Sequence, residues 1–282
     1  MPFGAATIAL ALAAAASWGA GDFGGGLASR RSPVFGVVLV SQFVGLLIAL
    51  GATILGAESF PTGTDLQLSV LAGLLGGTGI TALYRGLSIG RMGIVAPVTG
   101  ILAAVIPVTA GIILQGLPPD IVLGGIGVAF VAVLLVSRVA DESGGRAGLP
   151  EALVAGLTIG LFGVVLAQIS DGGIFAALSV IRVTQAVLVI VVVLVSRSAW
   201  RVGRAALPAV VVVGILDMAG NAFYFLAIQS GPLAIASSLS SLYPVGTVIL
   251  AAILLRERVS RDHAVGIVLA GVAIVMIGAG SG

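Results

Sequence analysis

The 282-residue chain is 59% hydrophobic and only 9% charged, with 13 basic and 11 acidic residues. A water-soluble domain of this size needs far more polar residues to cover its surface, so the composition excludes a soluble globular protein. The chain has no cysteine and a single histidine, His263, which excludes disulfides and thiolate metal sites. Its basic residues are all arginines, nearly all of them in short loops, which is typical of membrane topology and does not indicate nucleic-acid binding.

Apolar segments of about 20 residues, the length that crosses a bilayer as a helix, recur along the whole chain. They predict an all-α polytopic membrane protein, because the strands of a transmembrane barrel would alternate polar and apolar residues and these runs do not. The first run lacks the charged segment and cleavage site of a signal peptide, so it is interpreted as a span. In chain order, the ten predicted spans cover residues 5–27, 34–55, 67–89, 93–114, 119–137, 151–170, 174–195, 205–227, 233–255 and 263–279.

The two halves of the chain share a pattern. From Tyr84 to Val98, and again from Tyr224 to Leu239, an aromatic residue near the end of one helix is followed by a glycine turn and a small-residue helix. The longest hydrophilic stretch lies at the midpoint and predicts a linker, 142–150, between a first five-helix unit, 1–141, and a second, 151–282. Because each unit has an odd number of spans, the second must enter the membrane upside down, which predicts two inverted five-helix repeats.

The distribution of charge predicts the orientation of the spans. Every arginine except Arg182 lies in or beside a loop that follows an odd-numbered span, whereas the even-numbered loops contain no arginine and carry acidic residues such as Glu58 and Asp120. Basic residues are retained on the cytoplasmic side, so both termini are expected outside the cell. Abundant Ala, Gly and Val without lysine suggest a GC-rich bacterial genome, so the expected location is the bacterial inner membrane.

Several features resemble a known family. They are the ten spans, the Trp18–Gly19 pair, the small-residue helix after the glycine turn, and the stretch from Pro244 to Arg256–Glu257–Arg258. Together they resemble the drug/metabolite transporter superfamily and, within it, the EamA-type family of ten-helix proteins. Gln115 departs from the pattern, because the family usually has a glutamate there. The resemblance implies ATP-independent movement of small metabolites or drugs through a central cavity lined by both halves.

Two charged residues lie near the middle of predicted spans, Arg182 in the seventh and Asp217 in the eighth. A charge at the bilayer centre costs about 2.5–3.5 kcal/mol on insertion scales, so such residues are functional candidates. Asp217 either binds a cationic group or a proton in the cavity, or forms a structural ion pair with Arg182. Arg182 shares a face with Gln185, and a role in holding the seventh helix to its neighbours is favoured over contact with a substrate carboxylate.

Other polar and aromatic residues share faces with these charges. Asn221 and Tyr224 lie one and two turns after Asp217, and the corresponding face of the first half is expected to be Gly77, Thr81 and Tyr84. Trp18 either stacks on a substrate or belongs to an interfacial aromatic belt, and Asp22 is interpreted as interfacial.

The ninth span contains a dense group of serines, Ser237, Ser238, Ser240 and Ser241, just before Pro244, which frees a backbone carbonyl one turn earlier. They are interpreted as part of a cavity wall. The full predicted substrate-binding set is Trp18, Tyr84, Asp217, Asn221, Tyr224, Ser238, Ser241 and Tyr243.

These observations predict a secondary transporter that works by alternating access, with Asp217 as a candidate proton carrier. The alternative is a membrane scaffold or receptor subunit without transport, which would need neither a polar cavity nor inverted symmetry. An intramembrane enzyme is not expected, since the interior of the spans contains no cysteine, histidine or acidic pair and His263 lies at the edge of the last span. The expected partners are a small metabolite and the lipid bilayer, with no nucleic acid, cofactor or metal, and the protein is expected as a monomer or homodimer.

Overall fold

The computed structural model describes residues 4–90, 92–136, 147–170, 172–254 and 261–280, and these residues are almost entirely α-helical. The all-α, polytopic fold class predicted from the sequence is therefore confirmed. The helices are α1 (Ala5–Ser29), α2 (Val34–Leu55), α3 (Gly63–Ile89), α4 (Met92–Gln115), α5 (Asp120–Val136), α6 (Leu149–Leu166), α7 (Ile174–Ser196), α8 (Leu207–Ser230), α9 (Leu233–Ser240), α10 (Tyr243–Leu254) and α11 (Arg261–Ala279).

The ninth predicted span is divided into two helices, α9 and α10, whereas each of the other spans corresponds to one helix. Pro244 has no amide hydrogen, so it cannot donate to the carbonyl of Ser240 and the regular helix stops there. The chain turns instead, and the Ser241 and Leu242 amides donate to the carbonyls of Ser237 and Leu239 at 3.0 and 3.2 Å. Within the described residues, 8 helices are long and apolar enough to cross a membrane.

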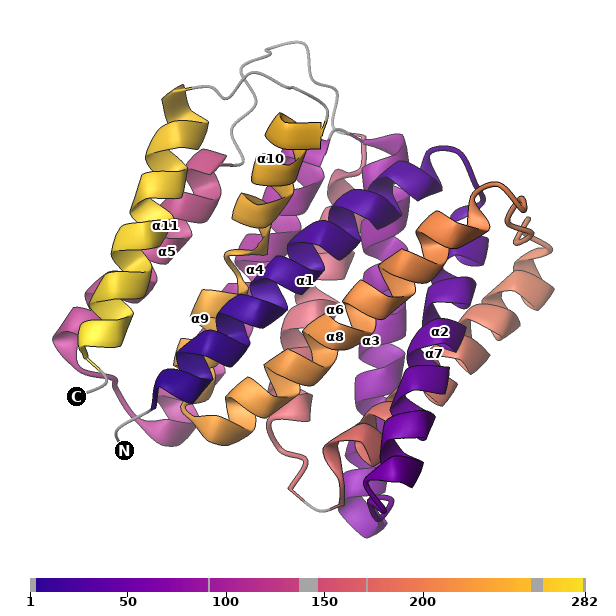
Figure 1. The fold of residues 1–282 in the computed structure, drawn as a ribbon, viewed down its shortest axis with the longest axis horizontal. Helices are drawn as coiled ribbons and strands as arrows, with labels where there is room; N and C mark the ends of the chain where they lie inside the picture. The colour runs from indigo at the N-terminus through magenta and orange to yellow at the C-terminus, as the bar shows by residue number, and fades with distance from the viewer. Residues whose placement is uncertain (1–3, 91, 137–146, 171, 255–260, 281–282) are drawn as a thin grey trace.

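The helices run back and forth between two faces of the molecule (Figure 1). Both termini lie at one face, and the connections 30–33 and 197–206 lie at the opposite face (Figure 1). Both connections follow odd-numbered spans, so they lie at the same face, as the distribution of arginines along the sequence predicts. Which face meets the cytoplasm remains a prediction.

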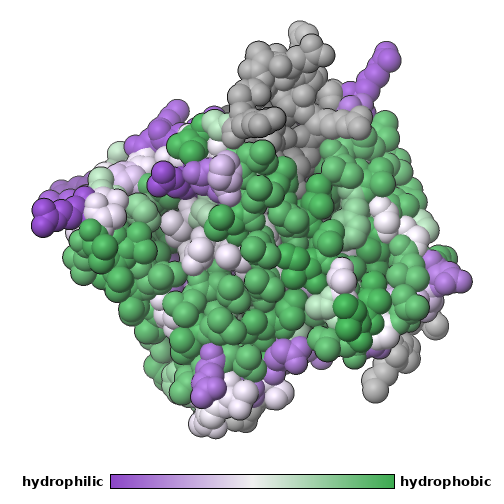
Figure 2. All heavy atoms as spheres, turned by 180° about the vertical axis from the view of Figure 1, so that it is seen from behind, coloured by the Kyte–Doolittle hydropathy of each residue, from purple (hydrophilic) through white to green (hydrophobic). Residues whose placement is uncertain are grey.

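The outer surface between these faces is apolar. Large side chains are strongly exposed on it, for example Leu55 at 90% and Val195 at 81%. Figure 2 shows a nearly continuous hydrophobic surface, with the hydrophilic residues gathered at its edges. Apolar exposure on this scale is unfavourable in water and favourable in lipid, which supports a multi-pass membrane protein.

The two halves of the chain interleave. Helix α1 packs along α8 and α3 along α6, while α2 packs with α7 and α5 with α11. Small residues permit these close crossings: a Cβ atom on Gly19 of α1 would lie 2.6 Å from the carbonyl oxygen of Tyr243, at the start of α10. Likewise Gly73 faces α7 and Gly156 faces α4, as expected for helix-packing glycines.

Two acidic side chains accept hydrogen bonds from backbone amides near the face that carries the termini. Glu58 accepts a hydrogen bond from the Ala176 amide at 2.8 Å, in the first turn of α7, where the helix dipole favours negative charge. Asp65 of α3 accepts one from the Ser170 amide at 3.2 Å. Residues 142–146 of the predicted linker lie outside the described residues, and α6 begins at Leu149.

Candidate functional site

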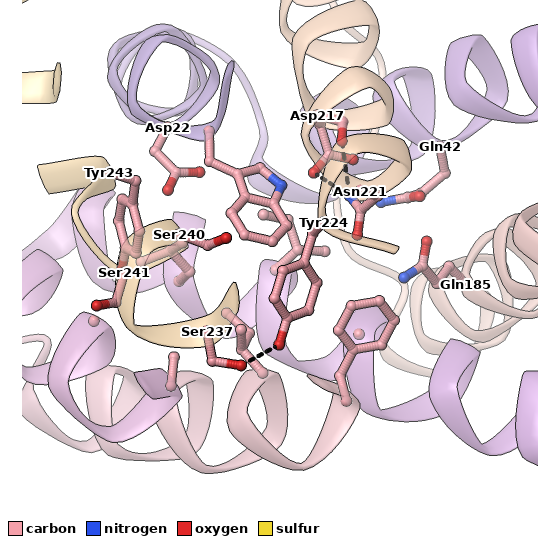
Figure 3. A pocket seen from close by; sticks show the side chains of 18 of the residues that line it. Asp22, Gln42, Gln185, Asp217, Asn221, Tyr224, Ser237, Ser240, Ser241 and Tyr243 are labelled. Carbon is pink, nitrogen blue, oxygen red and sulfur yellow. Dashed lines mark hydrogen bonds between the residues drawn. The ribbon is translucent and has the colours of Figure 1, made fainter. Parts of the chain in front are cut away.

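A cavity of about 90 Å³ lies inside the helix bundle, between the two halves of the chain. Its lining residues come from α1, α2, α3 and α4 of the first half and from α6, α7, α8, α9 and α10 of the second. In Figure 3, Asp22 and Tyr243 lie at one side of the cavity and the amides of Gln42 and Gln185 at the other.

The lining residues of the two halves correspond to one another along the sequence. Every lining residue of the first half has a lining residue 140 or 141 positions later in the chain. The pairs are Trp18 and Ile159, Asp22 and Phe162, Gln42 and Arg182, Gly76 and Asp217, Ile80 and Asn221, Leu83 and Tyr224, Gly100 and Ser240, and Ala103 and Tyr243. Only Gln185, Ser237 and Ser241 lie outside these pairs.

A buried ion pair joins α7 and α8. Nη1 of Arg182, a side chain that is 2% exposed, lies 2.6 Å from Oδ2 of Asp217. The same nitrogen donates to the side-chain oxygens of Gln42 and Gln185. The Asn221 amide donates to Oδ1 of Asp217 at 3.2 Å, so both carboxylate oxygens are occupied. Of the two alternatives predicted for Asp217, the structure contains the ion pair, which fixes the charge in place.

Aromatic rings form the centre of the lining. The rings of Trp18 and Tyr224 meet at a tilt of 52°, with centroids 5.3 Å apart. The Tyr224 and Ser237 hydroxyls share a hydrogen bond of 2.8 Å, which ties α8 to α9 (Figure 3). Gly220 leaves room for the indole and Gly163 for the tyrosine hydroxyl, since a Cβ at either position would come within 3 Å of the ring system. Both rings are therefore held by close packing against glycines, and Tyr224 is held by its hydrogen bond as well.

Asp22 is the remaining charged residue of the lining. Within the described part of the chain, no hydrogen bond or ion pair reaches its carboxylate. It interacts electrostatically with Asp217 across the cavity and with Tyr243 beside it. Arg182 is already matched by Asp217, so no cationic side chain of the described lining is left to pair with Asp22.

The cavity has two chemically different walls. We call the part of the lining contributed by α1, α2, α7 and α8 the polar wall, because it carries Asp22, Gln42, Arg182, Gln185, Asp217 and Asn221. We call the part contributed by α3 and α6 the apolar wall, because it carries Ile80, Leu83, Ile159 and Phe162. The serines of α9 and the ring of Tyr243, at the start of α10, complete the lining.

Most of the predicted substrate-binding residues lie together in this cavity. Trp18, Asp217, Asn221, Tyr224, Ser241 and Tyr243 all line it. Tyr84 is buried against Gly25 of α1 and is not part of the lining. Ser238 is fully buried, and its hydroxyl donates to the carbonyl of Ile235 in the same helix at 3.0 Å.

The structure corrects the expected match between α3 and α8. The residues of α3 that line the cavity are Gly76, Ile80 and Leu83, one position before the predicted Gly77, Thr81 and Tyr84. Gly77 and Thr81 instead line a separate groove together with Arg85. Successive residues of a helix point about 100° apart, so a shift of one position exchanges a polar face for an apolar one.

Five polar lining residues were not among the predicted site residues: Asp22, Gln42, Gln185, Ser237 and Ser240. Asp22 was interpreted as interfacial because it lies near the end of its span, and Gln42 was not considered. Ser237 and Ser240 were noticed only as part of the serine group. A usable signal exists for Gln42, because an amide inside a span that lies 140 residues before Arg182 is its expected counterpart in the repeat.

Comparison with known families bears on the second half of the chain. Residues 146–279 match the EamA-like transporter family. The second half is therefore similar to an EamA-like transporter unit. This match confirms the resemblance to the drug/metabolite transporter superfamily predicted from the sequence, and it suggests a membrane transporter of small substrates.

Solved structures extend the likeness to nearly the whole chain. One crystal structure, described only as that of a protein, has a TM-score of 0.76 and covers 94% of this chain and 98% of its own. Its sequence identity is 16%, so it shows that the fold is shared. No curated protein sequence matches the chain significantly.

Proposed function

We propose that this protein is a secondary transporter that carries a small molecule across the membrane by alternating access, with the central cavity as its binding site. The observation that carries the proposal is the paired lining, in which each half contributes corresponding residues to one cavity. Secondary transporters built from inverted repeats bind their substrates at the interface between the repeats. The EamA-like match of residues 146–279 supports the same function.

The packing of the helices supports an inverted repeat. Helix α1 packs along α8 as α6 packs along α3, and these are corresponding helices if each half is a five-span unit. The separation of 140 or 141 residues between paired lining positions is within one residue of the offset of 140 between the sequence patterns that begin at Tyr84 and Tyr224. Two such units can exchange conformations, so that the cavity opens first to one side and then to the other.

The Arg182–Asp217 pair has a positioning role in this proposal. It neutralises two charges inside the bundle and fixes α7 to α8 beside the cavity. If Asp217→Asn retains transport with an unchanged pH dependence, the predicted proton-carrying role of Asp217 is excluded.

Accessibility of single cysteines tests alternating access directly. The natural chain has no cysteine, so Ala103→Cys in the cavity lining places a single reactive group there. We expect it to react with a membrane-impermeant maleimide both in right-side-out and in inside-out vesicles. Val187→Cys, exposed on the lipid-facing side of α7, is the matched control and should react in neither. Reaction of Ala103→Cys from one side only, under all ionic conditions, would contradict the proposal.

Flux measurements separate a transporter from the scaffold or receptor alternative. Proteoliposomes loaded with a mixture of small metabolites should exchange at least one component with the medium, whereas a non-transporting scaffold would exchange none. Mass spectrometry of the vesicle contents over time provides the readout. Liposomes without protein provide the baseline.

We further propose the bacterial inner membrane as the location, with both termini outside. The loop between α7 and α8 would then be cytoplasmic, in keeping with its arginines Arg197, Arg201 and Arg204. Ala199→Cys, exposed in that loop, should be labelled only in inside-out vesicles. Labelling only in right-side-out vesicles would reverse the orientation.

A further inference from the structure

We propose that the substrate is a small amphipathic organic cation, whose ammonium group binds at Asp22 and whose apolar part lies against the apolar wall. This inference rests on the proposed transport function and specifies its cargo.

The first argument is the charge balance of the cavity. Arg182 and Asp217 lie 2.6 Å apart and cancel each other, whereas Asp22 has no counter-ion among the described residues. An unpaired carboxylate inside a membrane bundle is costly, and such groups commonly mark the place where a charged ligand binds. A bound cation would supply the counter-ion that Asp22 lacks among the described residues.

The second argument is the aromatic surroundings of Asp22. Trp18 lies one helical turn before it, and the Trp18 ring is braced against Tyr224. Tyr243 lies within electrostatic range of the carboxylate, at the same side of the cavity (Figure 3). Aromatic faces attract alkylammonium groups, and the attraction grows when the site is desolvated. A carboxylate with several rings near it favours an organic cation over a hydrated metal ion.

The third argument is the contrast between the two walls. The position that corresponds to Asp22 in the second half is Phe162, and the positions that correspond to Asn221 and Tyr224 in the first half are Ile80 and Leu83. The pairs therefore place polar groups on α1 and α8 and apolar groups on α3 and α6. A molecule with a charged head and an apolar body can satisfy both walls in a single orientation.

The test uses tryptophan fluorescence from the cavity. The chain has two tryptophans, so Trp200→Phe leaves Trp18 as the only reporter. The probes are benzyltrimethylammonium, the neutral isostere neopentylbenzene and the anion phenylmethanesulfonate, titrated into the full-length protein in detergent. We expect the cation to quench Trp18 fluorescence saturably. The neutral and the anionic probe should each bind about tenfold more weakly or less.

Substitutions at Asp22 show whether the carboxylate is responsible. Asp22→Asn should weaken cation binding about tenfold or more, and Asp22→Glu should restore most of it because the charge is retained. Asp120→Asn, which removes an exposed acid at the start of α5, is the control of equal net charge and should bind like the parent protein. Equal cation affinity in the parent and Asp22→Asn, or equal affinity for all three probes, would overturn the inference.

Flux assays distinguish failure of this inference from failure of the proposed function. If the proteoliposomes exchange neutral or anionic metabolites and the cation does not bind, the protein is a transporter and the cation assignment is wrong. If the cation binds in an Asp22-dependent manner while no cation or metabolite is exchanged, the binding site stands and the transport function falls.

Discussion

The two walls of the central cavity come from corresponding positions of the two halves, yet they differ in chemistry. On α8 the lining positions carry Asp217, Asn221 and Tyr224, and on α3 their counterparts are Gly76, Ile80 and Leu83. On α1 and α6 the contrast is reversed, because Asp22 of the first half faces the cavity where the second half has Phe162. An inverted repeat would thus give the two halves a similar backbone arrangement, while differences in residue type between the halves produce a cavity with a polar wall and an apolar wall. Function in such a protein is expected to follow from the places where the halves differ.

The largest expected effect comes from breaking the ion pair, which has no counterpart in the first half. Arg182→Ala leaves Asp217 buried without its partner, and we expect a loss of about 3–5 kcal/mol of unfolding free energy. The double variant Arg182→Gln/Asp217→Asn should recover most of this loss, since it removes both charges and places at position 182 the residue found at Gln42. Unfolding by sodium dodecyl sulfate in mixed micelles measures both. Equal stability of the single and double variants would contradict the pairing.

The second prediction places a charge on the apolar wall. Phe162→Asp gives α6 the residue that α1 has at Asp22, and we expect a loss of about 2.5–3.5 kcal/mol, the cost of an unpaired charge at membrane depth. Phe162→Leu preserves apolarity and should cost less than about 1.5 kcal/mol. The same detergent unfolding assay compares them. A stable Phe162→Asp variant would mean that this wall already tolerates water and that the contrast between the walls is weaker than described.

The third prediction concerns the crossing that brings Tyr243 to the cavity. A methyl group on Gly19 would lie 2.6 Å from the Tyr243 carbonyl oxygen, so Gly19→Ala should cost about 1–3 kcal/mol through overpacking. Gly51→Ala in α2 is the matched control, because no atom lies within 4 Å of its added Cβ. It should leave stability unchanged or raise it by up to about 1 kcal/mol. Thermal unfolding followed by circular dichroism tests both, and equal losses would show that the crossing is looser than described.

The smallest expected effect comes from removing one hydroxyl group from α8, at the position whose counterpart on α3 is the apolar Leu83. Tyr224→Phe removes the hydrogen bond to Ser237 but keeps the ring on Trp18, so we expect a loss of about 0.5–1.5 kcal/mol. A double-mutant cycle with Ser237→Ala should give a coupling energy of about 0.6 kcal/mol, typical of hydrogen bonds between membrane helices. A coupling energy of zero would mean that the hydroxyls do not bind each other in the membrane.

Periodicity and composition were sufficient to predict nearly all of the helices. Long apolar runs have few alternatives in a bilayer, because every backbone group must be bonded within its own segment. The division between α9 and α10 was the exception, since a proline signals a weakened helix without specifying whether the helix bends or stops. The site was predicted in part: Asp217 and Tyr224 lie in the cavity lining, whereas Asp22 was assigned to the interface from its position along the span.

The sequence by itself determined that the chain forms a series of apolar helices, that its two halves share a pattern, and that Arg182 and Asp217 lie near the middle of their helices. These properties depend on local composition and on distance along a helix, which the sequence contains directly. Only the tertiary structure decided that Gly76 rather than Gly77 faces the cavity, that Arg182 is matched by Asp217, and that Asp22 has no partner among the residues that the structure describes. Those outcomes depend on the rotation of each helix about its axis, which is set by packing against neighbours that are distant in the sequence.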